Sequence, residues 1–271
     1  SLSTQDALDG TAEFINYVKT NSNNTDGRVQ VAVTPRFIPS CTDEALHSLG
    51  ALASENSTYI QTHCSESDWE HNYVIDRCGK SDTEALLSYG LLNRSTILAH
   101  ANFISENDMD VIKEHGAGIA HCPLSNFFFS DAVFPLRRAL EKGLRIGLGT
   151  DISGGPSSSI IDTSRNAIIA ARALENGVNP NIERTNRGLP DSRVDFCDAF
   201  YLATKGGADV LNIPTGSFER GNFFDALLID TEIESAPISL SDDSDKDIVQ
   251  KIIMLATRVN IVKTWVSGLT V

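Results

Sequence analysis

Apolar stretches that suit buried strands recur along the first 150 residues, and each leads through a polar turn into a helix-like pattern. The expected strands begin near residues 29, 58, 95, 117 and 144, so a strand returns about every 30 residues. This repeat predicts α/β units of the kind that close into a (β/α)8 TIM-type barrel of about 250 residues. Five units are visible. We therefore expect strands 4 to 8 of such a barrel here, with three earlier units preceding residue 1.

The segments between these strands carry helix signals. Apolar positions at helical spacing predict a helix over residues 4–20. Thr42 is suited to cap a second helix, and Ser105 with Asp108 has the spacing of a capping box. Further helices are expected near residues 83–89, 131–142 and 159–175, and residues 193–212 also have a helical pattern.

The pattern changes after residue 212. Residues 218–230 predict a turn that enters a strand, and residues 261–271 predict two short strands about Ser267 and Gly268. We expect residues 1–212 to form the barrel portion and residues 213–271 to form part of a small β-sandwich domain with the terminal segment. The acidic stretch at 241–247 is interpreted as a solvated loop or a helix cap.

Composition narrows the class of partner. The chain has 271 residues, a formal charge of −14 and a pI near 4.8, which disfavours nucleic acid and anionic membrane surfaces as partners. Five widely spaced cysteines indicate a reduced, intracellular protein without a disulfide framework. No apolar run approaches the roughly 20 residues of a membrane span, and the first residue is not methionine. We expect a small-molecule substrate and a start inside a longer polypeptide.

Three of the expected strands end in residues that can bind metal. His63 ends the second strand, His100 the third, and Asp151 the fifth. Each alone could be a core histidine or a helix cap, but ligands of parallel α/β folds bind outside the carboxyl ends of the strands. Imidazole and carboxylate suit Zn²⁺ or Fe²⁺ and leave room for an activated water. Glu66 follows His63 by three residues and could move a proton beside that metal.

Several motifs resemble those of one known family. They are Thr-Pro-Arg-Phe at 34–37, Gln-Thr-His-Cys-Ser-Glu at 61–66, Leu-Ala-His at 98–100, Ala-His-Cys-Pro-Leu-Ser-Asn at 120–126 and Gly-Leu-Gly-Thr-Asp at 147–151. Together they resemble the guanine deaminases of the amidohydrolase superfamily, from about residue 29 to the carboxyl end. The resemblance implies zinc-dependent hydrolysis of guanine to xanthine and ammonia in purine catabolism, by a cytoplasmic homodimer.

The resemblance also implies roles for the strand-end residues. His63 and Asp151 would be ligands of one zinc ion, and His100 would orient the attacking water and bond to the tetrahedral intermediate. Glu66 would protonate a ring nitrogen of the purine. Asp151 would take the proton of the attacking water and pass it to the departing ammonia.

Substrate recognition is expected from the Pro-Arg-Phe motif. Arg36 and Phe37 would hold the purine, because a planar guanidinium donates to an exocyclic oxygen and cannot serve an amino group. The alternative for Arg36 is a surface salt bridge. Cys64 and Ser65 also belong to the expected substrate-binding set, which is completed by His63, Glu66 and Asp151.

The family pattern is not complete in this sequence. No His-x-His motif occurs, and no lysine ends the strand of residues 29–37, so a single metal is implied with further ligands from a His-x-His outside this sequence. Two alternatives stay open: another mononuclear aminohydrolase or chlorohydrolase acting on a different heteroaromatic ring, and an inert barrel scaffold without metal. His121 is expected to be structural and His71 to lie on the surface.

Overall fold

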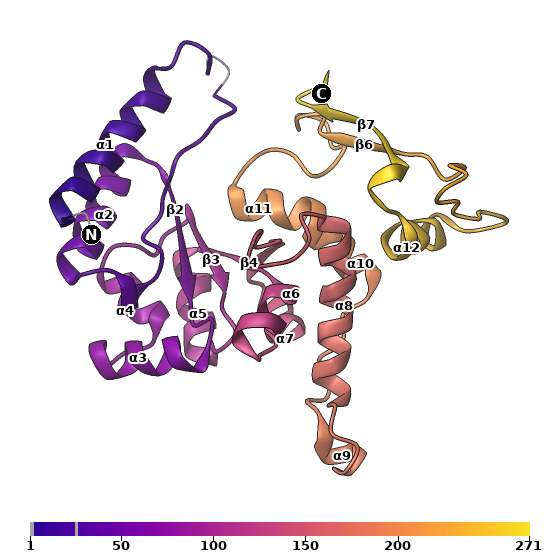
Figure 1. Ribbon diagram of the computed structural model, residues 1–271, viewed down its shortest axis with the longest axis horizontal. Coiled ribbons are helices and arrows are strands. Elements are labelled where there is room, and N and C mark those ends of the chain that lie inside the picture. Colours follow the sequence, from indigo (N-terminus) through magenta and orange to yellow (C-terminus); the bar gives the residue numbers. More distant parts are fainter. Residues whose placement is uncertain (1–2, 25–26) are drawn as a thin grey trace. The chain divides into compact units, whose positions relative to one another are not determined.

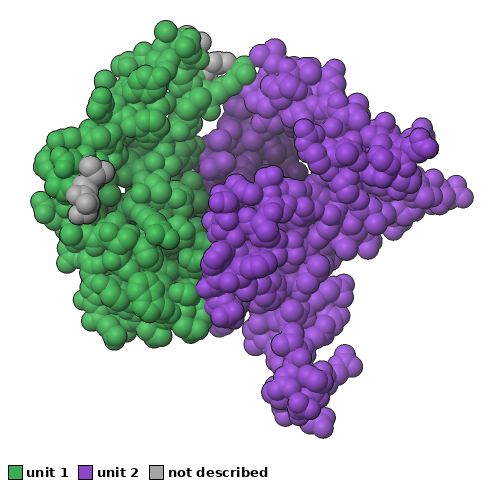
Figure 2. Space-filling model, viewed as in Figure 1, with its two compact units in different colours: residues 1–119 green, residues 120–271 purple. Residues whose placement is uncertain are grey.

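The computed structural model describes residues 3–24 and 27–271. The chain divides into two compact units, Ser1–Ile119 and Ala120–Val271, which Figure 2 shows in green and purple. The boundary falls inside strand β4 (Gly118–His121). The described residues contain no helix that is both long enough and apolar enough to cross a membrane.

Five parallel strands form the main sheet in the order β1-β2-β3-β4-β5. Their bounds are Ala32–Val33, Tyr59–Cys64, Thr96–His100, Gly118–His121 and Arg145–Leu148. Each strand is followed by helical structure (Figure 1). The expected α/β fold with a parallel sheet is therefore confirmed, and closure of an eight-stranded barrel stays an expectation.

The helices of the first unit begin where side chains cap them. They are α1 (Thr4–Thr20), α2 (Asp43–Asn56), α3 (Asp68–Cys78), α4 (Asp82–Ser88) and α5 (Glu106–His115), with a short 3₁₀ turn η1 (Ile38–Ser40). Thr42 accepts a hydrogen bond from the Ala45 amide, and Ser105 forms the expected capping box with Asp108. Gly116 ends α5 in the left-handed conformation that glycine adopts without strain. These capping predictions are confirmed.

The helices of the second unit begin with a short helix, α6, and a π-helical turn, η2. In chain order they are α6 (Pro123–Ser125), η2 (Asn126–Ser130), α7 (Leu136–Glu141), α8 (Ile160–Asn176), α9 (Arg184–Arg187), α10 (Phe196–Tyr201), η3 (Leu202–Gly206), α11 (Gly207–Leu211), α12 (Asp245–Leu255) and η4 (Arg258–Asn260). The acidic stretch at 241–247 is in part a helix cap, because Ser244 and Asp247 form a capping box at the start of α12.

A second, three-stranded sheet lies in the carboxyl-terminal segment. Strands β6 (Ala226–Ile229), β7 (Ile261–Val266) and β8 (Leu269–Thr270) pair antiparallel. The predicted turn about Ser267 and Gly268 joins β7 to β8. The β-sandwich remains an expectation, as does the domain boundary at residue 212.

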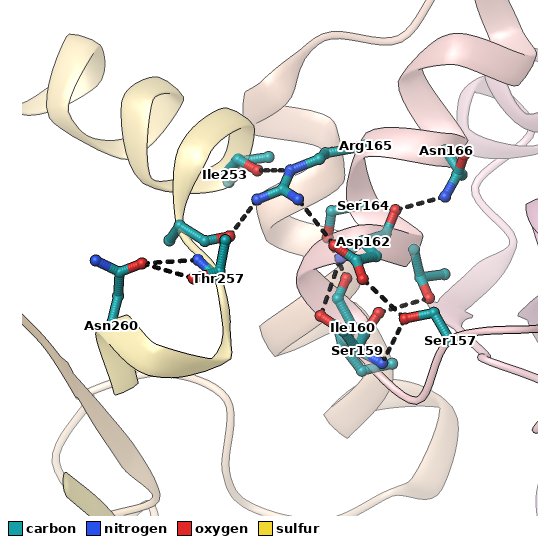
Figure 3. Close-up of polar contacts among 12 residues, drawn as sticks. Ser157, Ser159, Ile160, Asp162, Ser164, Arg165, Asn166, Ile253, Thr257 and Asn260 are labelled. Atoms are coloured by element: carbon teal, nitrogen blue, oxygen red, sulfur yellow. Dashed lines mark hydrogen bonds and ion pairs between the residues drawn. The ribbon is translucent and has the colours of Figure 1, made fainter. Parts of the chain in front are cut away.

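One arginine joins this segment to α8. The Arg165 guanidinium donates to the carbonyl oxygens of Ile253, at 2.7 Å, and of Ala256, and it pairs with Asp162 at 2.8 Å (Figure 3). Because the last carbonyls of a helix have no partner within it, Arg165 satisfies polar groups at the end of α12. Helix α12, which precedes strand β7 of the second sheet in the chain, is therefore hydrogen-bonded to α8 through Arg165.

Candidate functional site

Strand β2 presents His63 and Cys64 to opposite faces, as alternation along a strand requires. The His63 ring nitrogen Nδ1 lies 2.6 Å from the carbonyl oxygen of Arg36. A carbonyl can only accept, so Nδ1 carries the proton and Nε2 keeps its lone pair. A histidine whose one ring nitrogen donates to a backbone carbonyl is oriented to bind a metal through the other nitrogen.

His100 lies beside His63 at the end of the neighbouring strand. The two rings stack with centroids 5.1 Å apart, and the His100 side chain is fully buried. Its Nε2 atom is 3.7 Å from Oε1 of Glu66, which is longer than a hydrogen bond but close enough for an ionic contact. The first unit thus brings together His63, His100 and Glu66, as the sequence predicts.

Arg36 and Phe37 lie next to this group. The guanidinium of Arg36 lies over the Phe37 ring, 5.1 Å from its centroid, and the Phe37 ring meets His63 edge-on at 6.2 Å. Within the described ranges 3–24 and 27–271, the exposed Arg36 side chain forms no ion pair. Its donor fork is therefore available to a ligand, and the structure does not favour the surface salt bridge.

The side chains of Cys64 and Ser65 point into the interior of the first unit. The Cys64 thiol is fully buried, 3.8 Å from the Thr83 hydroxyl, and burial raises the pKa of that thiol well above its ordinary value. The Ser65 hydroxyl donates to Asp82 at 3.1 Å and contacts His71 at 3.3 Å. A substrate role for either residue stays a prediction, and their side chains are already engaged with the protein.

A buried pair of carboxyl groups lies under the end of β2. Glu70 on α3 and Asp82 on α4 are at most 1% exposed. Burial and the neighbouring charge of Asp82 raise the pKa of Glu70 to about 8, and burial raises the pKa of Asp82 to about 6. The raised pKa of Glu70 means that its protonated form is favoured at neutral pH.

Asp151 follows β5 in the second unit, and the turn around it is tight. The Ser125 hydroxyl donates to Asp151 Oδ2 at 2.5 Å, which fixes the orientation of the carboxylate. A side chain at Gly155 would meet the Thr150 carbonyl at 2.0 Å, and the Gly155 amide donates to the Asp151 carbonyl. Glycine at position 155 therefore allows the backbone to turn tightly after Asp151.

Three residues of the candidate site, and Ala101 next to His100, adopt the left-handed backbone conformation. They are Ser65 (φ 46°), His100 (φ 70°), Ala101 (φ 56°) and Asp151 (φ 49°). Non-glycine residues in this region cost about 1–3 kcal/mol each and cluster at functional sites. The backbone is therefore strained at the ends of the strands, where the sequence predicts catalytic and metal-binding residues.

Sequence reasoning missed several supporting residues. Ser125 lies in a quoted motif, but nothing in the motif indicates its bond to Asp151. Glu70 stands three residues after Ser67, the spacing of a capping box, yet its carboxyl group accepts from the Glu66 amide instead. His71 was expected on the surface and is partly buried against Ser65 and Phe103; His121 packs on Phe134 at 5.2 Å.

The donors suit a divalent metal. His63 and His100 in the first unit and Asp151 in the second are residue types that bind metal ions, and imidazole and carboxylate are ligand types of catalytic zinc sites. Nε2 of His63 is the atom best prepared to bind a metal, because the other ring nitrogen, Nδ1, already donates to the Arg36 carbonyl.

The chain belongs to the amidohydrolase family, whose sequence model matches residues 3–271. It is similar to guanine deaminase of Dictyostelium discoideum, with 36% identity over 270 residues that cover 98% of this chain and 57% of that protein. The mouse (Mus musculus) guanine deaminase is 34% identical over 250 residues, covering 89% of this chain and 53% of its own.

A solved structure of guanine deaminase from C. acetobutylicum with bound guanine in the active site is also similar. Its TM-score is 0.83 at 29% identity, and the match covers 100% of this chain and 61% of that one. The chain thus spans about half the length of the curated relatives it matches.

Proposed function

We propose that this chain carries much of the active site of a guanine aminohydrolase, which converts guanine and water to xanthine and ammonia. The observation that carries the proposal is the grouping of His63, with Nε2 free, beside His100, Glu66 and the Arg36 fork. The guanine deaminases to which the chain is similar support the choice of substrate.

The proposed cofactor is one zinc ion. His63 and Asp151 would hold it, with His100 beside it, and the donor types fit this metal. When bound, zinc lowers the pKa of a water molecule and so supplies a nucleophile near neutral pH.

The protein's own residues would supply recognition and proton transfer. Arg36 would donate to the exocyclic oxygen of guanine, and Phe37 would pack on the purine ring. Glu66 would protonate a ring nitrogen, so that the ring accepts the electrons of the attacking water. His100 would hydrogen-bond to the tetrahedral carbon's new oxygen, and Asp151, oriented by Ser125, would move a proton to the departing amino group.

The finer expectations follow the family. A role in purine catabolism, a cytoplasmic location and a homodimer are part of the proposal, supported by the resemblance. A different heteroaromatic substrate is the second candidate. Both candidate functions would use the same metal-binding residues. They would differ in the residues that select the substrate ring, and Arg36 is the residue that most directly favours guanine.

A substrate panel tests the proposal. The complete polypeptide would be purified, its zinc measured, and ammonia release followed with guanine, adenine, cytosine and an amino-triazine, with chloride release followed for a chloro-triazine. Guanine should be turned over at least about 10²-fold faster than adenine, because a ring without the exocyclic oxygen would leave the Arg36 donors unpaired in the complex. Turnover of another ring with guanine untouched would contradict the proposal, and no zinc with no turnover would favour an inert scaffold.

A further inference from the structure

The peptide backbone of Glu66 is held at both ends by side chains outside the expected catalytic set. The Glu66 amide donates to Oε2 of Glu70 at 2.7 Å. Its carbonyl accepts from Nδ2 of Asn102 at 2.8 Å. Both partners are buried, Glu70 at 1% exposure and Asn102 at 7%, so neither bond competes with bulk water.

The neighbouring backbone requires such support. Ser65, directly before Glu66, is in the left-handed region, and the turn that follows β2 ends regular pairing there. Two further bonds fasten this turn to the loop after β3: Ala101 donates to the Cys64 carbonyl at 2.9 Å and Phe103 to the Ser65 carbonyl at 3.2 Å. The Glu66 carboxylate consequently leaves a strained turn whose direction is set by these contacts.

Glu70 lies in a buried acidic environment beside the turn. Among the residues that the structure describes, Glu70 Oε1 and Asp82 Oδ1 are buried oxygens without a conventional donor. Burial and the nearby charge of Asp82 raise the pKa of Glu70 and favour its protonated form, which has a hydroxyl donor that the carboxylate lacks. Asp82 is fixed in turn by the Ser65 hydroxyl. Both buried acids therefore contact the turn that follows β2, Asp82 through Ser65 and Glu70 through the Glu66 amide.

We propose that Glu70 and Asn102 are positioning residues that clamp the Glu66 peptide from both sides and thereby hold the Glu66 carboxylate beside His100 for proton transfer. The proposal rests on the proposed function, since it concerns the residue that would protonate the ring. Neither residue contacts the substrate in this account. Each acts only through the orientation of Glu66.

Substitutions at Glu70 separate positioning from bulk packing. In the complete enzyme, Glu70→Leu removes the acceptor for the Glu66 amide, whereas Glu70→Gln keeps a carbonyl acceptor of the same length and a donor for Asp82. We expect Glu70→Leu to lower kcat for guanine about 10-fold or more, with KM changed less than about 3-fold and zinc content unchanged. Glu70→Gln should recover most of the lost kcat.

Two further variants guard against a folding artefact. Asn102→Ala removes the opposite half of the clamp and should also lower kcat more than it changes KM, which keeps the test decisive if Glu70→Leu is insoluble. Ser81→Ala removes the neighbouring cap of α4 and contacts neither the Glu66 peptide nor its partners. It should lower stability and leave kcat within about 2-fold.

A double-mutant cycle tests whether Glu70 acts through Glu66. In a Glu66→Gln background, adding Glu70→Leu should lower kcat by less than about 2-fold, because the group being positioned is already gone. An effect as large as in the wild-type background would overturn the proposal. So would a Glu70→Leu enzyme with wild-type kcat.

Amide hydrogen exchange provides a readout that does not depend on turnover. Exchange at the Glu66 amide should be faster in Glu70→Leu than in wild type, and close to wild type in Glu70→Gln. If the wild-type protein does not deaminate guanine, the proposed function fails while this comparison still tests the clamp. Equal protection of the Glu66 amide in all three proteins would overturn the clamp even in an active enzyme.

Discussion

Replacing Glu70 by glutamine should change how the stability of the protein depends on pH. Glu70 is almost completely buried, and its pKa of about 8 in the folded protein compares with 4.5 for the free side chain. The folded state therefore keeps a proton that the unfolded chain releases above pH 4.5. Stability must fall as pH rises from about 4.5 to about 8, and the whole penalty is present above pH 8.

The size of the effect follows from the shift. One pKa unit corresponds to about 1.4 kcal/mol, so the interval from pH 5.5 to 8 contributes about 3 kcal/mol of lost stability through Glu70. For a protein of this size, 1 kcal/mol moves Tm by about 2–4 °C. Wild type should thus lose about 6–12 °C of Tm across that interval beyond the loss shown by Glu70→Gln, whose amide does not titrate.

Thermal melts of both proteins at pH 5.5, 6.5, 7.5 and 8.5 would measure this difference. A chelator in the buffer removes the pH dependence of metal binding from the comparison. Glu13→Gln, an exposed position on α1, is the matched control and should follow wild type. Parallel curves of Tm against pH for wild type and Glu70→Gln would refute the reasoning, because they would mean that Glu70 loses its proton in both states over the same range.

Three further substitutions test the site and the fold. Glu66→Gln in the complete enzyme should keep zinc and lower turnover by about 10² or more; turnover within a few-fold of wild type would remove Glu66 from the mechanism. Arg36→Lys keeps the charge and loses the planar fork, so kcat/KM for guanine should fall about 10-fold or more, and unchanged kinetics would place Arg36 outside the site. Arg165→Met removes the donors to the carbonyl of Ile253 in α12 and to that of Ala256, the residue that follows the helix, and should lower the free energy of unfolding by about 2 kcal/mol or more, measured by urea titration. Arg172→Met, exposed on the same helix, should not.

The elements that were predicted well are those with local signals. Helix caps such as Thr42 and Ser105 are readable because the capping side chain and its amide lie within three residues. His63 and His100 could be placed together because parallel strands end at one edge of a sheet. These inferences need only the period of the pattern and the topology of an α/β fold.

The elements that were missed depend on neighbours distant in sequence or on proline. The strand expected to begin at residue 29 is shorter and covers only Ala32–Val33. Val29 is exposed, and Pro35 has no amide hydrogen to donate to a neighbouring strand. The helix expected over 131–142 begins only at Leu136, because Pro135 disfavours a helical residue before it.

The buried acids were beyond sequence reasoning for a related reason. Glu70 lies in a polar stretch that is expected to face water, and charged residues are rarely buried unless paired. Its partner Asp82 is 12 residues away, on another helix. Only the packing of α3 and α4 under the end of β2 brings the two carboxyl groups together.

The left-handed residues at the strand ends limit which substitutions the site can accept. Ser65, His100 and Asp151 each meet two separate demands, one on the side chain's chemistry and one on the backbone's conformation. Glycine would relieve the backbone and remove the chemistry, whereas a β-branched residue would fail on both counts. Asparagine tolerates this backbone region best among side chains of similar size. At Asp151, an asparagine variant would therefore separate the loss of charge from the loss of conformation.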